Sequence, residues 1–137
     1  MPMLIADHVA EVVDAATDLI FENDGCTLSL TGDDTPTRGY AVSLAGFEEV
    51  HELDDEFIGY LVSRYIEKHR EELSGLNRYF GAWIDGSRLV LDVSVIVRDF
   101  SDAVALAYQH GQQAIYNLAR GEEIRMDDLY GRTAVAA

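Results

Sequence analysis

Five carboxylates recur near the start of the chain at intervals of three and four residues. They are Asp7, Glu11, Asp14, Asp18 and Glu22. On a helix, residues at these intervals lie on one face, with neighbouring side chains about 6 Å apart. Phosphates along one DNA strand lie roughly 7 Å apart, so such a row of charges could occupy the basic groove of a nucleic-acid-binding protein. These five residues are therefore the candidate partner-binding site.

An ordinary solvated helix face is the alternative explanation of this row. Ordinary faces interleave Lys and Arg with the acids, because opposite charges on a helix surface stabilise it. Here no Lys or Arg precedes Arg38, so nothing nearby offsets the repulsion between neighbouring carboxylates, a few tenths of a kcal/mol per pair. The missing basic residues favour the binding interpretation, although a generally acidic proteome would give the same charge.

The whole chain is also acidic, with 25 acidic and 10 basic residues and a formal charge of −15. Such a field repels nucleic acid and acidic membranes and attracts basic surfaces. We therefore expect a basic protein surface as the partner, for example on a nucleic-acid-binding host protein. We expect no direct binding of nucleic acid and no membrane association.

No residue pattern for catalysis or metal binding is present. The four histidines form no close pair with one another or with Cys26, as zinc sites require. The mixed face of a predicted strand holds Asp92 and Ser94, and an enzyme site around these two residues and Tyr116 is a further hypothesis. Ser94 lacks the strand–turn–helix setting of a nucleophile elbow, so we expect no catalytic residues, no metal and no cofactor.

The sequence features that bear on cellular location favour a cytoplasmic protein. A single cysteine excludes an internal disulfide and suits a reducing compartment. The N-terminus lacks the basic region of a signal peptide, and no apolar run approaches the roughly 18 residues that a membrane span needs.

Hydrophobic periodicity predicts helices over residues 6–22, 55–73 and 102–110, the last with Ser101 as its N-cap. Strands are predicted at 26–30 and 38–44, paired as a hairpin, and at 79–85 and 88–97, joined by a type I′ turn at Asp85-Gly86. A final strand over 113–118 is expected parallel to the 88–97 strand. Residues 47–53 fit either a helical turn or an edge strand.

These elements predict one α+β domain over residues 1–126. Its sheet is expected to be mixed, mostly antiparallel and built of four to five strands, with the three helices packed on it. Residues 127–137 are expected to form a flexible C-terminal tail.

Four short segments of the chain resemble those of small uncharacterised proteins of actinobacteria and their phages. The segments are Gly39-Tyr40-Ala41-Val42, Gly81-Ala82-Trp83, Leu91-Asp92-Val93-Ser94 and Ala114-Ile115-Tyr116-Asn117-Leu118. The resemblance covers roughly residues 39–124 and leaves the acidic first helix outside. It implies a cytoplasmic accessory protein, with a phage origin as one form of this, and brings no catalytic residues with it.

The sequence thus predicts a non-enzymatic acidic protein-binding module, in the manner of a phage-type inhibitor or DNA mimic that engages a basic partner surface. The alternative is a structural or assembly protein that self-associates, for instance as a homodimer, through its sheet or its second helix.

Overall fold

The computed structural model describes residues 2–30 and 35–129, with side chains from Val9 onward. The residues group into two compact units. The first contains Phe47–Ser94 and the chain up to Thr35, and the second contains Pro36–Gly46 and the chain from Val95.

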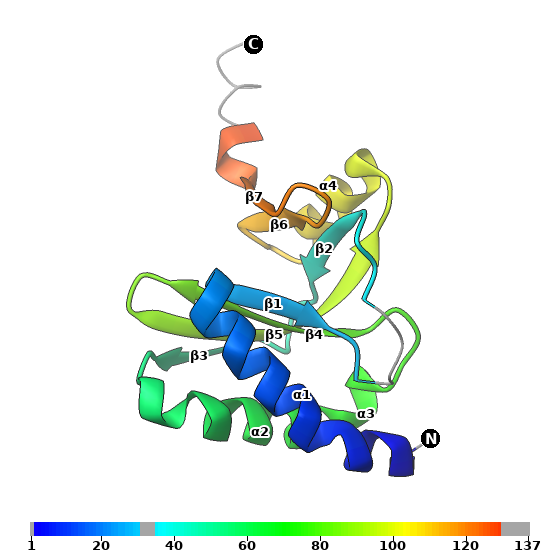
Figure 1. Cartoon of the computed structure of the whole chain (residues 1–137). Helices are drawn as coiled ribbons and strands as arrows, with labels where there is room; N and C mark the ends of the chain where they lie inside the picture. The colour runs from blue at the N-terminus through cyan, green and yellow to red at the C-terminus, as the bar shows by residue number, and fades with distance from the viewer. Residues whose placement is uncertain (1, 31–34, 130–137) are drawn as a thin grey trace. The chain divides into compact units, whose positions relative to one another are not determined.

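The first unit packs helices against an antiparallel sheet. Its helical elements are α1 (Pro2–Asn23), the 3-10 turn η1 (Asp55–Phe57), α2 (Ile58–Lys68) and α3 (Arg70–Leu73), and its strands are β1 (Gly25–Leu28), β3 (Glu49–Glu52), β4 (Tyr79–Asp85) and β5 (Arg88–Val97). Strand β4 lies between β1 and β5, and β3 pairs with the first half of β5 on its other side. Figure 1 shows α1 and α2 side by side, running in opposite directions along these strands.

The core of this unit lies between the helices and one face of the sheet. The register places Phe80 opposite Val93 and Ala82 opposite Leu91, so these side chains share a face. The ring of Tyr65 on α2 lies 5.8 Å from that of Phe80, which identifies this face as the one that the helices cover. Leu89, Leu91 and Val93 alternate along β5 on this face, and all three are fully buried.

The second unit contains β2 (Tyr40–Ser43), α4 (Phe100–Gln109), β6 (Ala114–Asn117) and β7 (Glu122–Arg125), together with the end of β5. Strand β2 lies between β5 and β6, and β7 pairs with β6. Helix α4 contacts β2 and β6. Its N-cap is Asp99, which accepts a hydrogen bond from the backbone N–H of Asp102 at 3.0 Å; the prediction of Ser101 as the cap was wrong.

The α+β class is confirmed, and so are the three helical regions, but the sheet prediction was too small. The described chain forms seven strands rather than four or five. The additional strands are β3 and β7, whose sequences Glu-Val-His-Glu and Glu-Glu-Ile-Arg hold one apolar residue each and so lack the composition of a typical strand. The second helical region is also broken, because His69 leaves helical geometry between α2 and α3.

One predicted pairing was wrong. Strand β1 pairs with β4 and strand β2 with β6, so the predicted hairpin between residues 26–30 and 38–44 does not form. Strand β6 pairs with β2, which separates it from β5 in the strand order. Strand partners depend on contacts between distant segments, which periodicity does not specify.

The β4–β5 hairpin forms where predicted but with a different turn. Asp85 pairs with Arg88, which leaves Gly86 and Ser87 as the turn residues. Only Gly86 has a positive φ, of 61°, which is typical of a type II′ rather than a type I′ turn.

The predicted tail at 127–137 lies mostly outside the described residues. Residues 126–129 are helical, and the Met126 side chain is buried.

Candidate functional site

Helix α1 presents its acidic residues to solvent. Ala16 and Ile20 are fully buried against the rest of the first unit, while Glu11, Asp14, Asp18 and Glu22 are exposed. At a rise of 1.5 Å per residue, Glu11 and Glu22 lie about 16 Å apart along the helix axis. The predicted face therefore exists for these four residues; the side chain of Asp7 lies outside the described residues.

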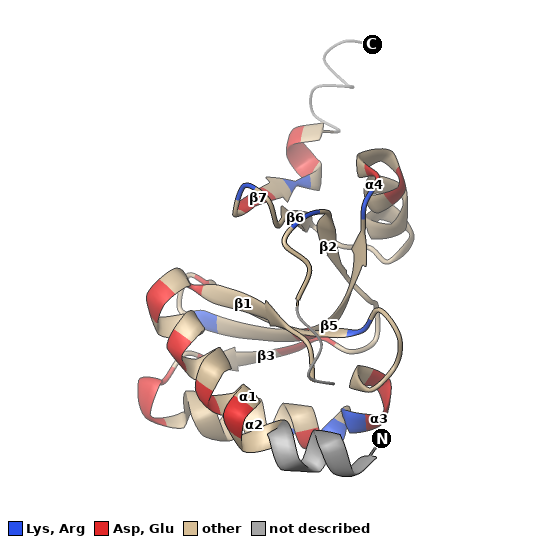
Figure 2. Cartoon of the chain, turned by 45° about the vertical axis from the view of Figure 1, so that its right-hand side comes forward, with Lys and Arg blue, Asp and Glu red and all other residues tan. Residues whose placement is uncertain are grey.

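No basic side chain forms an ion pair with Asp14, Asp18 or Glu22 within the described chain. Ion pairs there join basic side chains to other acids, among them Glu49, Glu67, Glu72 and Glu123. Figure 2 shows the acidic residues along α1 without an accompanying Lys or Arg on that helix. The three carboxylates are therefore available to an external cation.

Helix α1 is anchored by its buried side chains Ala16 and Ile20 and ends at Asn23. Asp24 follows with a φ of 64°, a left-handed conformation that is common just past a helix end. Gly25 then allows β1 to approach β4, because a Cβ there would lie 2.6 Å from the carbonyl oxygen of Ala82.

Asp92 and Ser94 form a buried pair on the other face of β5. They are 2% and 4% exposed, and the Ser94 hydroxyl donates to Oδ1 of Asp92 at 2.8 Å. Gly81 lies opposite Asp92 in the β4–β5 register, and a side chain there would overlap with the Asp92 carboxylate. A substrate in solution cannot reach two side chains that are this deeply buried, so their geometry is that of a structural hydrogen bond.

Cys26 and Tyr116 are the other two residues whose side chains could take part in a reaction. Burial, and to a smaller extent the charge of Asp92, raises the pKa of Cys26 to about 12, so its thiol stays protonated and unreactive at neutral pH. Tyr116 lies on β6, where its hydroxyl would be 3.6 Å from a Cβ on Gly121 in the β6–β7 turn.

A cluster around Glu49 joins β3 to α2, and sequence analysis missed it. The Glu49 carboxylate lies 3.1 Å from Nε2 of His51, 3.0 Å from Nζ of Lys68 and 3.6 Å from Nε2 of His69. Burial opposes ionisation, but the hydrogen bonds and charges of Lys68 and His51 hold the pKa of Glu49 below its usual value. In the sequence, the only indication of this cluster is that Glu49 and His51 are two residues apart and so share a face of a strand. Lys68 and His69 lie far along the chain, so their contacts with Glu49 leave no local pattern.

We expect Glu49→Gln to lower the free energy of unfolding by about 1 kcal/mol at pH 7, because the ion pair with Lys68 is lost and the hydrogen bond with His51 is weakened. A lowered carboxyl pKa stabilises the fold above the unfolded value, near 4.5, and this contribution disappears as pH falls through the lower folded value. Urea unfolding of both proteins at pH 7 and pH 3 measures this. A difference that persists undiminished at pH 3 would assign the effect to packing.

Neither a metal site nor a membrane span is found in the described chain. No group of three or more His, Cys, Asp and Glu side chains there could hold a metal ion. No described helix is both long and apolar enough to cross a bilayer.

Comparison with known proteins gives no match: no family model, no curated protein and no solved structure matches the chain.

Proposed function

We propose that this chain is a non-enzymatic binding module whose α1 face engages a basic surface on a partner protein. One observation carries the proposal: Asp14, Asp18 and Glu22 are exposed on a single helix and have no ion-pair partner in the described chain. A helix that retains like charges at these intervals is less stable than one with interleaved Lys, by a few tenths of a kcal/mol per pair. Binding to a cationic surface would offset this cost.

In its finer form, the proposal is an inhibitor or DNA mimic that occupies the nucleic-acid site of a host protein. The length of the α1 face and its regular carboxylate spacing support this form. Complementary charge would also accelerate encounter with a basic groove, with a strong dependence on ionic strength.

Burial argues against the enzyme hypothesis at Asp92 and Ser94. Their hydroxyl–carboxylate hydrogen bond is intramolecular and shielded, whereas a nucleophile must contact its substrate.

Affinity capture from an actinobacterial lysate tests the proposal. The baits are the native protein, an α1-neutralised variant (Asp14→Asn, Asp18→Asn, Glu22→Gln) and a charge-matched control variant (Asp85→Asn, Glu122→Gln, Asp127→Asn). Glu11 stays unchanged because it has a further interaction in the described chain.

At low salt, the native and control baits should retain the same basic protein, and the α1-neutralised bait should lose it. High salt should release it from all baits, because exposed charges are screened within about 10 Å at 0.1 M. Equal retention by the α1-neutralised bait contradicts the proposal.

A further inference from the structure

Three exposed aromatic side chains adjoin the acidic face at one end of the α1–α2 pair. Phe21 on α1 is 51% exposed, Phe57 at the end of η1 is 52% exposed, and Tyr60 on α2 is 57% exposed. We propose that these residues form the apolar anchor site for a cationic amphipathic segment of the partner protein. This inference rests on the proposed function and specifies the chemistry of the partner.

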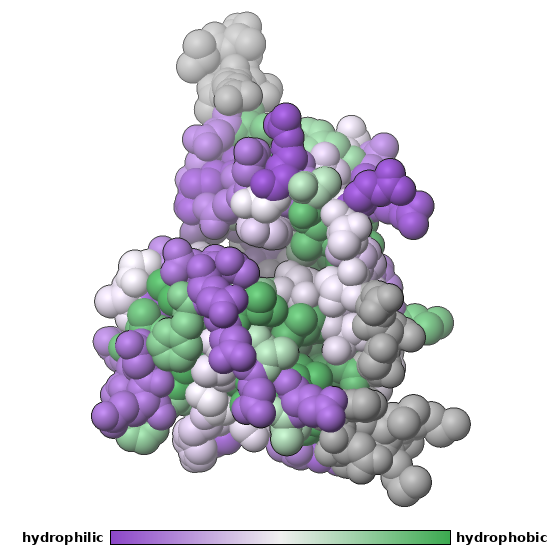
Figure 3. Space-filling model, viewed as in Figure 1, coloured by the Kyte–Doolittle hydropathy of each residue, from purple (hydrophilic) through white to green (hydrophobic). Residues whose placement is uncertain are grey.

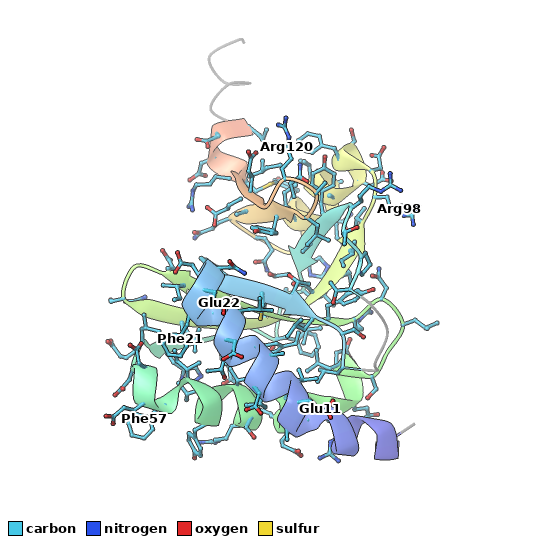
Figure 4. All side chains as sticks on the ribbon, viewed as in Figure 1. Glu11, Phe21, Glu22, Phe57, Arg98 and Arg120 are labelled. Atoms are coloured by element: carbon cyan, nitrogen blue, oxygen red, sulfur yellow. The ribbon has the colours of Figure 1, made fainter. Side chains whose placement is uncertain are left out.

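The α1–α2 contact places the three aromatics at one end of the helix pair. A Cβ on Gly59 would lie 3.8 Å from Oγ1 of Thr17, so these residues mark where the two helices meet. Phe21 follows Thr17 by one helical turn, and Phe57 lies two residues before Gly59 and Tyr60 one residue after it. Figure 4 shows Phe21 and Phe57 at the same end of the helix pair, with Glu22 beside Phe21. We call Phe21, Phe57 and Tyr60 the aromatic patch.

Carboxylates surround the aromatic patch. Asp18 and Glu22 are exposed beside Phe21, and the exposed Asp55 and Glu56 immediately precede Phe57. Among the residues that the structure describes, Arg64 is a cation held against the patch, with its guanidinium carbon 5.8 Å from the centre of the Tyr60 ring. Figure 3 shows apolar surface interrupted by hydrophilic side chains over this end of the helix pair.

The combination of aromatic rings and carboxylates indicates which kind of partner can bind at the aromatic patch. Exposed aromatic groups rimmed by polar residues are typical of protein-binding sites, and buried aromatics contribute much of the affinity at interfaces. A second copy of the chain would bring the same carboxylates against these, which electrostatic repulsion disfavours. A segment with apolar side chains on one face and Lys or Arg beside them complements both the rings and the acids.

Nucleic-acid mimicry alone does not require the aromatic patch. A purely polycationic surface would be bound by the α1 carboxylates without contacting the rings. The patch therefore distinguishes a partner with an apolar component from a merely basic one, and this is the property to test.

Two fluorescein-labelled probe peptides test whether the aromatic patch binds apolar side chains. The first consists of Leu and Lys arranged at helical period, and the second has every Leu replaced by Ser, so that the charge is unchanged. Fluorescence anisotropy is measured with the native protein, the α1-neutralised variant and an aromatic variant (Phe21→Ala, Phe57→Ala, Tyr60→Ala). The control variant is Leu76→Ala, because this side chain is 95% exposed and lies outside the patch.

The native and control proteins should bind the Leu/Lys peptide at least about tenfold more tightly than the Ser/Lys peptide. The aromatic variant should keep its affinity for the Ser/Lys peptide and show less than about threefold preference. The α1-neutralised variant should bind both peptides about tenfold more weakly than the native protein at low salt.

An aromatic variant that retains the native preference overturns the aromatic anchor and leaves the acidic binding face standing. Equal affinity of the native protein for both peptides has the same consequence. If neutralising α1 changes neither affinity, the proposed function itself fails.

Discussion

Replacing Gly81 by alanine is expected to lower the free energy of unfolding by about 3 kcal/mol. The added methyl group would overlap with Oδ1 of Asp92 and lie 3.2 Å from the Ser94 hydroxyl. Neither side chain can move away easily, since both are buried and hydrogen-bonded to each other. Urea unfolding followed by circular dichroism measures the loss.

Gly59→Ala is the matched control for this substitution. A Cβ at Gly59 would meet only Thr17, at an ordinary 3.8 Å, and the residue lies in α2. Alanine is favoured over glycine in a helix by up to about 1 kcal/mol, so this variant should be as stable as the native protein or more so.

A double-mutant cycle assigns the Gly81 effect to Asp92. Gly81→Ala combined with Asp92→Ala should be less destabilised than the sum of the single variants by at least about 1 kcal/mol, because the overlapping carboxylate is gone. Strict additivity, or a Gly81→Ala variant as stable as the native protein, would mean that the carboxylate does not lie over Gly81.

Tyr65→Ala should lower the free energy of unfolding by about 4 kcal/mol, which is the second large effect that we expect. Tyr65 is 1% exposed, and its ring lies 4.4 Å from that of His69 and 5.8 Å from that of Phe80, so it joins α2 to β4. Its hydroxyl donates to the carbonyl of Phe47 at 2.7 Å.

Tyr65→Phe separates the two roles of this side chain. This variant keeps the ring but leaves the Phe47 carbonyl without its hydrogen-bond donor. It should therefore lower the free energy of unfolding by only about 1 kcal/mol. Thermal unfolding of both variants tests this division, and equal losses would show that the hydrogen bond, not the ring, carries the stability.

The elements that sequence analysis found are those with a strong local pattern. The acids of α1 and the apolar positions Ala16 and Ile20 alternate at helical spacing, and Leu89, Leu91 and Val93 alternate at strand spacing. Gly86 was recognisable as a turn residue, although the turn type depends on which residues pair across it.

The features that were missed depend on segments far apart in sequence. The partners of β1 and β2 are β4 and β6, more than fifty residues away, and no local signal specifies them. The Glu49 cluster and the aromatic patch likewise form only where α2 packs against β3 and α1. The half-exposed Phe57 belongs to η1 and so lies outside the regular turns of α2, which the sequence pattern does not reveal.

The most direct test of the acidic α1 face is a calorimetric titration of the captured basic protein at low salt. Three proteins are titrated: native, α1-neutralised and charge-matched control. The account predicts that neutralising Asp14, Asp18 and Glu22 weakens binding at least about tenfold, whereas the control changes it less than about threefold despite the same net charge. Equal losses in both variants would mean that total charge, and not the α1 face, drives binding.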